Sequence, residues 1–424
     1  MIVTPRKISG VAAVVSAPPS KSYTHRALIA GALATGTSTI KNPLDAEDTR
    51  LTVGALKALG IRIEETGGNS STITVTGCGG SLPATTETTL DLNNSGTSLR
   101  LLTSLALLGK YPVILTGSQR MQERPIGPLA TALPSLGGHV DFLTKDGFPP
   151  LRVSGRLRGG SVTIDGSISS QFISSILLVA PYADKDVEVV IPTRPASRSY
   201  LDITLDVMKT FGAAVSREDY TKFVVSSKDR YLPRTYAVEG DYSSASYFFA
   251  IAAVCGGKVT VGNLAPDSVQ GDRRFLDALR EMGCTVTYPA GAVMVERNGA
   301  LNGITIDMST SPDTVQTLCA VAAMAKTPTT ITGIGHLKFK ESDRTNGTAE
   351  RLRSLGGNVE AGKDSLTIRP APLHGGTIDP ADDHRTAMSF AVLGLAIGGI
   401  TITNAECVTK SFPKFWEILA EVTK

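Results

Sequence analysis

The sequence has 424 residues, of which 42% are hydrophobic and 19% charged, and its formal net charge is +3. Because a single hydrophobic core stops growing at roughly 250 to 300 residues, this length predicts two domains. The small net charge and the single Trp argue against a nucleic-acid-binding protein, and the longest apolar stretches are shorter than the roughly 18 residues that span a bilayer.

The chain is expected to open with a strand and a loop. The first twenty residues hold an apolar patch, but its bulky side chains and the Pro18–Pro19 pair do not fit a signal peptide. Residues 21–42 then show an Ala- and Leu-rich helix, a short break and a strand rich in β-branched residues. Lys21 stands at the start of this helix, where the helix dipole disfavours a cation. Its position makes sense if an anion sits against the helix start.

The same pattern of helix, break and strand recurs six times along the chain. Its copies end at residues spaced by 75, 74, 72, 70 and 71 positions, namely Asn42, Gly117, Ile191, Asn263, Gly333 and Asn404. A second pattern interleaves with the first, and in it a glycine marks the C-terminus of another helix. These glycines are Gly60, Gly137, Gly212, Gly283 and Gly356, and a sixth copy is cut short in the final segment FWEILAEVTK.

Each repeat unit therefore holds two helices and several strands. This order predicts an α/β chain in which helical crossovers join parallel strands. The size limit on one core favours three units per domain, with a boundary within about residues 230 to 244.

Polar residues stand just before the first helix of every copy. If the units are arranged symmetrically, these helix starts point at shared space, and their unpaired N–H groups form a site for phosphates and carboxylates. For any single copy, ordinary helix capping explains the same residues. The residues concerned are Lys21 and Ser22; Ser95, Gly96 and Thr97; Ser169, Ser170 and Gln171; Ser243 and Ser244; Ser311, Pro312 and Asp313; and Asp383, His384 and Arg385.

Eight segments, in order over nearly the whole chain, resemble the signature segments of the 5-enolpyruvylshikimate-3-phosphate synthase family. They are PPSKSYTHRALI, NNSGTSLRLL, MQERPIGPL, SSQFISSILL, SRSYLDITLDVMKTFG, FKESDRTNGTAERLRSLGG, DDHRTAMSF and VTKSFPKFWEIL. The resemblance implies an inside-out, barrel-like α/β fold of two domains, each of three βαβαββ units, hinged by two crossovers. The implied N-terminal domain covers residues 18–239, and the C-terminal domain covers residues 240–424 plus the first strand in residues 1–17.

The resemblance also implies a reaction. The 5-hydroxyl of shikimate 3-phosphate attacks C2 of phosphoenolpyruvate, and the tetrahedral adduct loses phosphate on the route to chorismate and the aromatic amino acids. It implies no metal or organic cofactor, and a monomer with no nucleic-acid or membrane partner. The two substrates bring roughly five or six negative charges. A chain of net charge +3 must therefore concentrate its cations, and the segments do so with Lys21, Arg26, Arg100, Arg124, Lys340, Arg344, Arg385 and Lys410.

Site residues follow from the resemblance position by position. Shikimate 3-phosphate would be held by Lys21, Ser22, Arg26, Ser169, Ser170, Gln171, Ser197, Tyr200, Asp313, His336 and Lys340, with its phosphate near Ser170 and Ser197. Phosphoenolpyruvate would be held by Lys21, Gly96, Arg124, Gln171, Lys340, Arg344, Arg385 and Lys410. Gly96 fits because the missing Cβ lets backbone approach a ligand closely.

The chemistry needs a base for the hydroxyl and an acid for the methylene carbon. Asp313 is the first choice for the base, and Glu341 is the candidate for proton transfer at the methylene. Lys21 could share the acid role with support from His384, so this division stays open. Two positions depart from the commoner family pattern: His336 stands where an Asn often contacts the sugar-like ring, and Ser199 replaces a frequent Pro beside Tyr200.

Two other readings of the residues stay open. The sister enzyme that transfers enolpyruvyl to UDP-N-acetylglucosamine resembles this fold, but it commonly carries a reactive Cys in the loop that corresponds to residues 116–127, which contain none. The second alternative is a non-catalytic anion-binding repeat protein, or an RNA-terminus enzyme built from similar units. It predicts that Asp313→Asn and Glu341→Gln are tolerated.

The cysteines indicate the compartment. Their number is odd and no two have CxxC spacing, so disulfides and zinc sites are not expected. They are Cys78, Cys255, Cys284, Cys319 and Cys407, and free thiols of this kind favour the cytoplasm.

Overall fold

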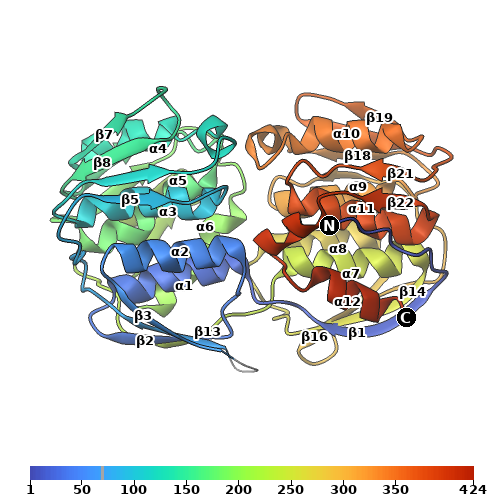
Figure 1. The fold of residues 1–424 in the computed structure, drawn as a ribbon, viewed down its shortest axis with the longest axis horizontal. Helices are drawn as coiled ribbons and strands as arrows, with labels where there is room; N and C mark the ends of the chain where they lie inside the picture. The colour runs from blue at the N-terminus through green and yellow to red at the C-terminus, as the bar shows by residue number, and fades with distance from the viewer. Residues whose placement is uncertain (68–70) are drawn as a thin grey trace. The chain divides into compact units, whose positions relative to one another are not determined.

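A computed structural model describes residues 1–67 and 71–424 of the chain (Figure 1). The described chain forms two compact units. Unit 1 comprises Met1–Pro18 and Glu239–Lys424, and unit 2 comprises Pro19–Val238. Each unit has its own hydrophobic core. No helix among the described residues is both long and apolar enough to cross a membrane.

Unit 2 contains three four-stranded sheets, each with one parallel and two antiparallel pairings. Their orders are β13-β2-β4-β3, β5-β6-β8-β7 and β11-β12-β10-β9. The strands are β2 (Thr37–Lys41), β3 (Arg62–Thr66), β4 (Thr72–Thr76), β5 (Thr88–Asp91), β6 (Val113–Thr116), β7 (Gly138–Phe142), β8 (Leu151–Gly155), β9 (Gly160–Thr163), β10 (Val187–Val190), β11 (Val215–Glu218), β12 (Lys222–Val225) and β13 (Thr235–Ala237). The helices are α1 (Lys21–Leu33), α2 (Glu47–Ala58), α3 (Gly96–Leu105), α4 (Gly127–Ala132), α5 (Ser170–Val179) and α6 (Ser199–Thr210).

Unit 1 contains two four-stranded sheets, β1-β14-β16-β15 and β17-β18-β20-β19, and the two-stranded sheet β21-β22. The strands are β1 (Val11–Ser16), β14 (Gly257–Gly262), β15 (Thr285–Thr287), β16 (Ala292–Arg297), β17 (Thr305–Asp307), β18 (Thr329–Thr332), β19 (Asn358–Ala361), β20 (Ser365–Arg369), β21 (Gly376–Ile378) and β22 (Ile400–Ile402). The helices are α7 (Tyr242–Cys255), α8 (Arg274–Glu281), α9 (Val315–Ala322), α10 (Arg344–Ser354), α11 (His384–Ile397) and α12 (Phe415–Val422), with short 3₁₀ turns η6 (Pro312–Thr314), η7 (Gly335–Phe339) and η8 (Ala405–Lys410) among the connections.

The repeat predicted from the sequence is confirmed in the backbone. The five glycines of the second pattern all have a left-handed φ, from 87° at Gly356 to 105° at Gly283, as is typical of a glycine after the last helical turn. The residues that end four of the six copies of the first pattern also have a positive φ, namely Asn42, Asn263, Gly333 and Asn404. Several helices begin earlier than predicted, because residues expected just before them lie in their first turns, namely Lys21, Gly96, Ser170, Ser243 and His384.

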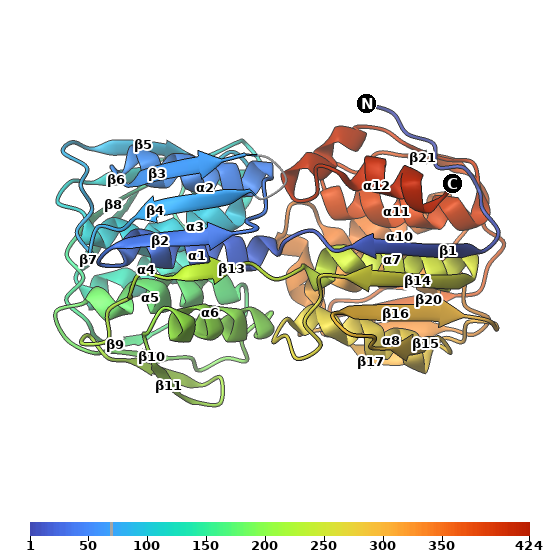
Figure 2. The same cartoon turned by 90° about the horizontal axis from the view of Figure 1, so that it is seen from below.

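Two strands are exchanged between the first and the fourth repeat of the chain. β1 pairs in parallel with β14, and β13 pairs in parallel with β2, as Figure 2 shows. The first strand of the chain therefore belongs to unit 1, although the helix that follows it, α1, belongs to unit 2. The chain passes from one unit to the other twice, directly before α1 and directly before α7.

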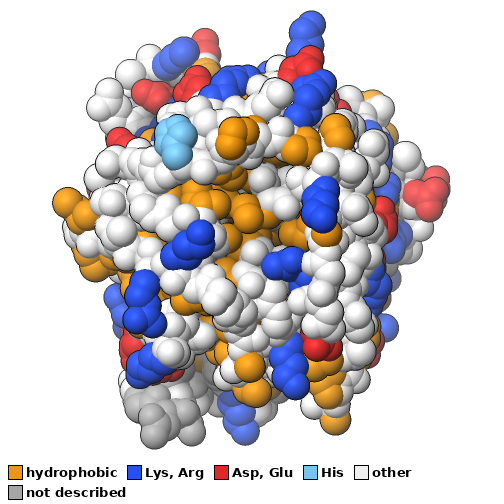
Figure 3. Space-filling view, turned by 90° about the vertical axis from the view of Figure 1, so that its right-hand side faces the viewer, with side chains coloured by type: hydrophobic (Ala, Val, Ile, Leu, Met, Phe, Trp, Pro, Cys, Tyr) orange, Lys and Arg blue, Asp and Glu red, His pale blue; other side chains and the backbone are white. Residues whose placement is uncertain are grey.

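The first helices of the repeats form the inside of each unit. In unit 1, α7, α9 and α11 pack on one another. The buried Thr317 hydroxyl of α9 is hydrogen-bonded to those of Ser246 on α7 and Ser389 on α11. Figure 3 shows one face of unit 1, on which apolar side chains gather near the centre and Lys and Arg side chains are spaced singly around them. The cations of this face are thus spread out, in contrast to the buried arginines described next.

Candidate active site

The start of α1 carries a buried ion pair. Ser20 caps the helix, and Lys21 is its first residue. The Nζ atom of Lys21 donates to Oδ2 of Asp48 at 2.9 Å, and only 12% of the Lys21 side chain and 2% of the Asp48 side chain are exposed. Asp48 lies in the first turn of α2. The unfavourable position of a lysine at a helix start is therefore offset in part by a carboxylate within the protein, a partner that sequence reasoning did not find.

Arg26 is a buried cation that has neutral partners. Its guanidinium donates to the Thr204 hydroxyl at 2.7 Å, to the Ser22 and Tyr200 carbonyls at 3.0 and 3.2 Å, and to the Ser174 hydroxyl at 3.4 Å. Burial lowers the pKa of Arg26 to about 10, so the guanidinium stays charged at neutral pH. These contacts use four of its five N–H donors, and none of the acceptors is a carboxylate.

Arg124 lies directly over the start of α3. Its Nη1 donates to the carbonyl and to the side-chain oxygen of Asn94, both at 3.1 Å, and the residue is buried. A Cβ added at Gly96 would lie 2.6 Å from Nη2 of Arg124. A side chain at residue 96 would therefore displace the Arg124 guanidinium, and the close approach of the Gly96 backbone to a ligand stays a prediction.

The start of α5 is tied to the start of α3 by Gln171. Its Nε2 donates to Thr97 Oγ1 at 2.9 Å, and its Oε1 accepts from Nη1 of Arg100 at 2.8 Å. Arg100 also donates to the carbonyl of Pro125, the neighbour of Arg124, at 3.4 Å. One network therefore holds Gln171 and the Arg124 segment together.

Ser169, Ser170, Ser197 and Tyr200 also lie in unit 2. Ser169 caps α5 and accepts from the backbone N–H of Gln171. Ser170 and Ser197 are buried, and Ser197 has a left-handed φ of 54°. A left-handed serine costs free energy of the order of 1 to 3 kcal/mol and is maintained where the surroundings fix the backbone. The segment that carries Ser197 and Tyr200 is thus held in one conformation.

In unit 1, Arg344 is the centre of an ion-pair cluster with three carboxylates. It donates to Asp383 Oδ2 and Glu341 Oε2, each at 2.8 Å, and to Asp313 Oδ1 at 3.1 Å. The exposed fractions of the Arg344 and Asp383 side chains are 1% and 0%. Burial by itself would lower the pKa of Arg344, but the three carboxylates outweigh burial and raise the pKa above its usual value. Burial also opposes ionisation of Asp383, yet Arg344 holds the pKa of that carboxyl below its usual value.

Arg385 joins the same cluster from the start of α11. Its Nη2 lies 2.6 Å from Asp313 Oδ2, and its Nη1 donates to the Asp313 carbonyl at 3.0 Å. Nη2 also donates to Ser243 Oγ at 3.2 Å. Asp313 is therefore held between two guanidiniums, those of Arg344 and Arg385. Asp383 caps α11 by accepting from the backbone N–H of Arg385, so one aspartate positions both arginines.

The other predicted residues of unit 1 surround this cluster. His384 is fully buried, with Nδ1 4.0 Å from Asp383 Oδ1. Lys340 follows η7, which carries His336, and directly precedes Glu341. Lys410 is buried at the end of η8, which packs against α11.

His336 is a buried histidine near three of these charged groups. Burial, together with the positive charges of Lys340 and Arg344, lowers its pKa to about 3, and Asp313 only partly opposes this. The imidazole is therefore neutral at physiological pH. It can offer both a donor and an acceptor, as the amide of the commoner asparagine does.

The low pKa of His336 predicts a pH dependence of stability. The pKa is 6.5 in the unfolded chain and about 3 in the folded one, so the unfolded state binds more protons between these values. The free energy of unfolding should therefore decrease as the pH falls below about 6.5, by up to about 1.4 kcal/mol per pH unit from this group. Urea unfolding at several pH values from about 5 to 7 should show a shallower dependence for His336→Asn. A control variant of the exposed His374, His374→Asn, should keep the wild-type dependence, and an unchanged slope in His336→Asn would contradict the assignment.

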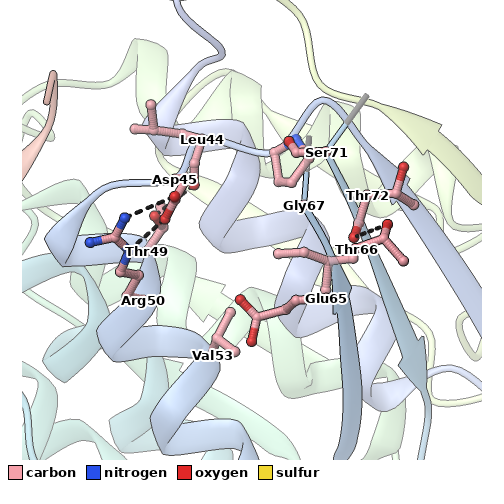
Figure 4. A pocket seen from close by; sticks show the side chains of 12 residues that line it. Leu44, Asp45, Thr49, Arg50, Val53, Glu65, Thr66, Gly67, Ser71 and Thr72 are labelled. Atoms are coloured by element: carbon pink, nitrogen blue, oxygen red, sulfur yellow. Dashed lines mark hydrogen bonds and ion pairs between the residues drawn. The ribbon is translucent and has the colours of Figure 1, made fainter. Parts of the chain in front are cut away.

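A cavity of about 200 Å³ lies elsewhere in unit 2, between α2 and the β3–β4 strands (Figure 4). Arg50 at its edge is paired with Asp45 at 2.5 Å, and both side chains are largely exposed. None of the site residues predicted from the sequence lines this cavity. Its one arginine is already neutralised, so the cavity lacks the unpaired buried cation seen at Arg26.

These features define a class of protein: a mixed α/β protein of six small sheets, whose repeated helix starts carry buried cations and a carboxylate cluster suited to acid–base chemistry on anionic substrates. Residues 5–419 match the family model of EPSP synthase (3-phosphoshikimate 1-carboxyvinyltransferase). The chain belongs to this family, and its activity is that of a 3-phosphoshikimate 1-carboxyvinyltransferase.

The similarity to individual relatives extends over the full length. The chain is 64% identical to the 3-phosphoshikimate 1-carboxyvinyltransferase of Methanoregula boonei, with 100% of each chain covered. It is 41% identical to that of Serratia proteamaculans, over 100% of this chain and 99% of the relative. The structure of EPSP synthase from Acinetobacter baumannii superposes with a TM-score of 0.82 at 28% identity, covering 100% and 98% of the two chains. The expected α/β fold is confirmed by this match.

Proposed function

We propose that the two sets of residues described above act on the same two substrates, shikimate 3-phosphate and phosphoenolpyruvate. The observation that carries the proposal is the cluster in which Asp313 and Glu341 share Arg344. It places two carboxylates, a potential base and a potential acid, around one cation within a buried environment. General acid–base catalysis of an addition followed by an elimination needs such a pair.

In the addition step, Asp313 accepts the proton of the 5-hydroxyl while the hydroxyl oxygen forms a bond to C2 of phosphoenolpyruvate. Glu341 in its protonated form delivers a proton to the methylene carbon, which becomes a methyl group. In the elimination step, Glu341 takes a proton back from the methyl group as the bond between C2 and the phosphate oxygen breaks. Inorganic phosphate leaves with the electron pair of that bond. Lys21 and His384 support proton transfer in this proposal.

Binding of phosphoenolpyruvate changes the partners of Asp313. Arg385 is bonded to Asp313 Oδ2 in the structure, and Arg suits a planar carboxylate. The substrate carboxylate competes with Asp313 for this guanidinium. Once Arg385 turns to the substrate, Asp313 keeps only one arginine, Arg344, and becomes a stronger base.

Arg26 supports the assignment of the first substrate. A buried guanidinium with neutral partners attracts an anion, and the adjacent Tyr200 carbonyl links it to the Ser197 segment. We assign shikimate 3-phosphate to Arg26 together with Lys21, Ser22, Ser169, Ser170 and Gln171, and we assign Asp313, His336 and Lys340 to the same substrate.

Arg124 supports the assignment of the second substrate, together with Gly96, Gln171, Lys340, Arg344, Arg385 and Lys410. We expect Arg124→Ala to raise the KM for phosphoenolpyruvate by about 100-fold or more, because a buried charged hydrogen-bond donor to a carboxylate or phosphate contributes roughly 3 kcal/mol. The KM for shikimate 3-phosphate should change much less. Initial-rate kinetics with each substrate varied in turn measures both constants.

The matched control is Arg120→Ala, because Arg120 lies in the same segment but is exposed and paired with Glu123. It should leave both KM values near those of the wild type. Equal effects of the two substitutions, or a rise in the KM for shikimate 3-phosphate alone, would overturn the role of Arg124.

Two further features belong to the proposal. The five cysteines are all free, which supports function in a reducing compartment such as the cytoplasm. We also propose that the protein acts as a monomer, which light scattering of the purified protein tests.

A further inference from the structure

A repeated aspartate stands four residues before the helix cap in four of the six repeats. The pairs are Asp91 and Ser95, Asp165 and Ser169, Asp307 and Ser311, and Asp379 and Asp383. In each copy the aspartate Oδ1 accepts a hydrogen bond from the backbone N–H two residues later, at 2.7 to 2.9 Å. The same turn thus sets the path from strand to helix start in all four copies.

The two copies without this aspartate are informative. The corresponding positions are Ser16, before the cap Ser20, and Ala237, before the cap Asp241. These are the two places where the chain passes from one unit to the other. The aspartate turn therefore occurs where the strand and the next helix belong to the same unit, as expected of a device that fixes the helix start on its own sheet.

Asp165 has a second partner besides the backbone N–H of Ser167. Its Oδ1 also accepts from the Thr193 hydroxyl at 2.8 Å, and Thr193 Oγ1 in turn accepts from the Gly166 N–H at 3.1 Å. The Gly166 carbonyl accepts from the N–H of Ala196 at 2.9 Å. Asp165 is thus the point that joins the turn before α5 to the segment that ends in Ser197.

These two segments carry the residues assigned to the phosphate of shikimate 3-phosphate. One leads to Ser169, Ser170 and Gln171, and the other to Ser197 with its left-handed backbone. Partial burial of Asp165 raises its pKa, but the hydrogen bonds from Ser167 and Thr193 outweigh burial and hold the pKa below its usual value. The carboxylate is therefore ionised and fully available as an acceptor at neutral pH.

We propose that Asp165 is a positioning residue for shikimate 3-phosphate: it fixes the α5 start and the Ser197 segment relative to each other without touching the substrate. The inference rests on the proposed function, since that function assigns the phosphate to these two segments. A displacement of about 1 Å in a positioning element can cost up to about 100-fold in rate or affinity. The effect of changing Asp165 should fall on shikimate 3-phosphate and not on phosphoenolpyruvate. The helix start beside Arg124, which is assigned to phosphoenolpyruvate, is held in the same way by a different aspartate, Asp91.

The test compares variants by steady-state kinetics and by calorimetric titration with shikimate 3-phosphate. Asp165→Ala should raise the KM and Kd for shikimate 3-phosphate by about 10-fold or more and leave the KM for phosphoenolpyruvate within about twofold. Asp165→Asn should restore most of the affinity, because its amide oxygen accepts the same two hydrogen bonds. Asp91→Ala should show the opposite split, with the larger change in the KM for phosphoenolpyruvate.

Two more variants keep the test decisive. Thr193→Val removes the two hydrogen bonds of the Thr193 hydroxyl, to Asp165 and from Gly166, and keeps the bond from Ser167 to Asp165. It should weaken shikimate 3-phosphate binding even if Asp165→Ala does not fold. Asp186→Ala is the control, because Asp186 accepts similar hydrogen bonds from Ser227 elsewhere in the same sheet region, and it should bind as the wild type. Wild-type affinity in Asp165→Ala and Thr193→Val, or equal changes for both substrates, would overturn the inference. A wild-type protein that does not bind shikimate 3-phosphate at all would instead overturn the proposed function.

Discussion

Asp313→Asn lowers kcat by about 10²- to 10⁴-fold if Asp313 is the base that accepts the 5-hydroxyl proton, because this is the usual cost of losing a general acid or base. The asparagine side chain has the same shape, its one oxygen can still accept from Arg344 or Arg385, and the bond from Arg385 to the carbonyl of residue 313 is kept, so the protein should fold. Glu341→Gln should lower kcat over the same range, since it cannot donate or take back the methylene proton. Phosphate release at saturating concentrations of both substrates measures the effect.

The control for these carboxylates is Asp277→Asn on α8. Asp277 pairs with Arg274 and Arg280, as the site carboxylates pair with arginine, but its side chain is 46% exposed. This variant should keep wild-type turnover. Near wild-type kcat in both Asp313→Asn and Glu341→Gln would remove these residues from proton transfer and favour a non-catalytic anion-binding protein.

Arg344→Ala should destabilise unit 1 and abolish turnover together. The substitution leaves Asp383 fully buried without its charged partner, next to the carboxylates of Asp313 and Glu341. Removing one partner of a buried ion pair typically costs about 3 to 5 kcal/mol in the free energy of unfolding. Urea unfolding followed by circular dichroism measures the stability, and phosphate release measures the turnover.

A second substitution separates the role of the cluster from that of surface charge. Arg369→Ala removes an arginine that pairs with Glu360 in the same unit, but 41% and 71% of these two side chains are exposed. Exposed pairs contribute about 0 to 1 kcal/mol, so this variant should stay close to wild type in stability and turnover. If Arg344→Ala cost no more than Arg369→Ala, the buried cluster would not hold the start of α10 to the start of α11 as described.

Much of the fold could be predicted because it repeats. The glycine that ends a helix and the residue that ends a strand recur at a nearly constant spacing, and their backbone requirements are local properties that the sequence displays. The structure confirms them at Gly60 and at Asn263, for example. The pairing of β1 with β14 is different, because it joins residues about 245 positions apart and depends on which sheet has room for the strand, not on any local pattern.

The site was predicted only in part for the same reason. The resemblance supplied Asp313, Glu341, Arg344 and Arg385, and the structure brings these four side chains into direct contact. Their chemical roles remain predictions. Two carboxylate partners of the site cations were missed, since Asp48 reaches Lys21 and Asp383 reaches Arg344 across helices that are separate in the chain.

Phosphorus-31 NMR of the purified protein with phosphoenolpyruvate and one acceptor at a time tests the central claim of enolpyruvyl transfer most directly. With shikimate 3-phosphate, the account predicts that the phosphoenolpyruvate signal is replaced by that of inorganic phosphate while the shikimate 3-phosphate signal is replaced, in equal amount, by that of a new phosphomonoester, and that neither product forms without the acceptor. Phosphate release that does not require shikimate 3-phosphate, or a product formed with UDP-N-acetylglucosamine in its place, would contradict it.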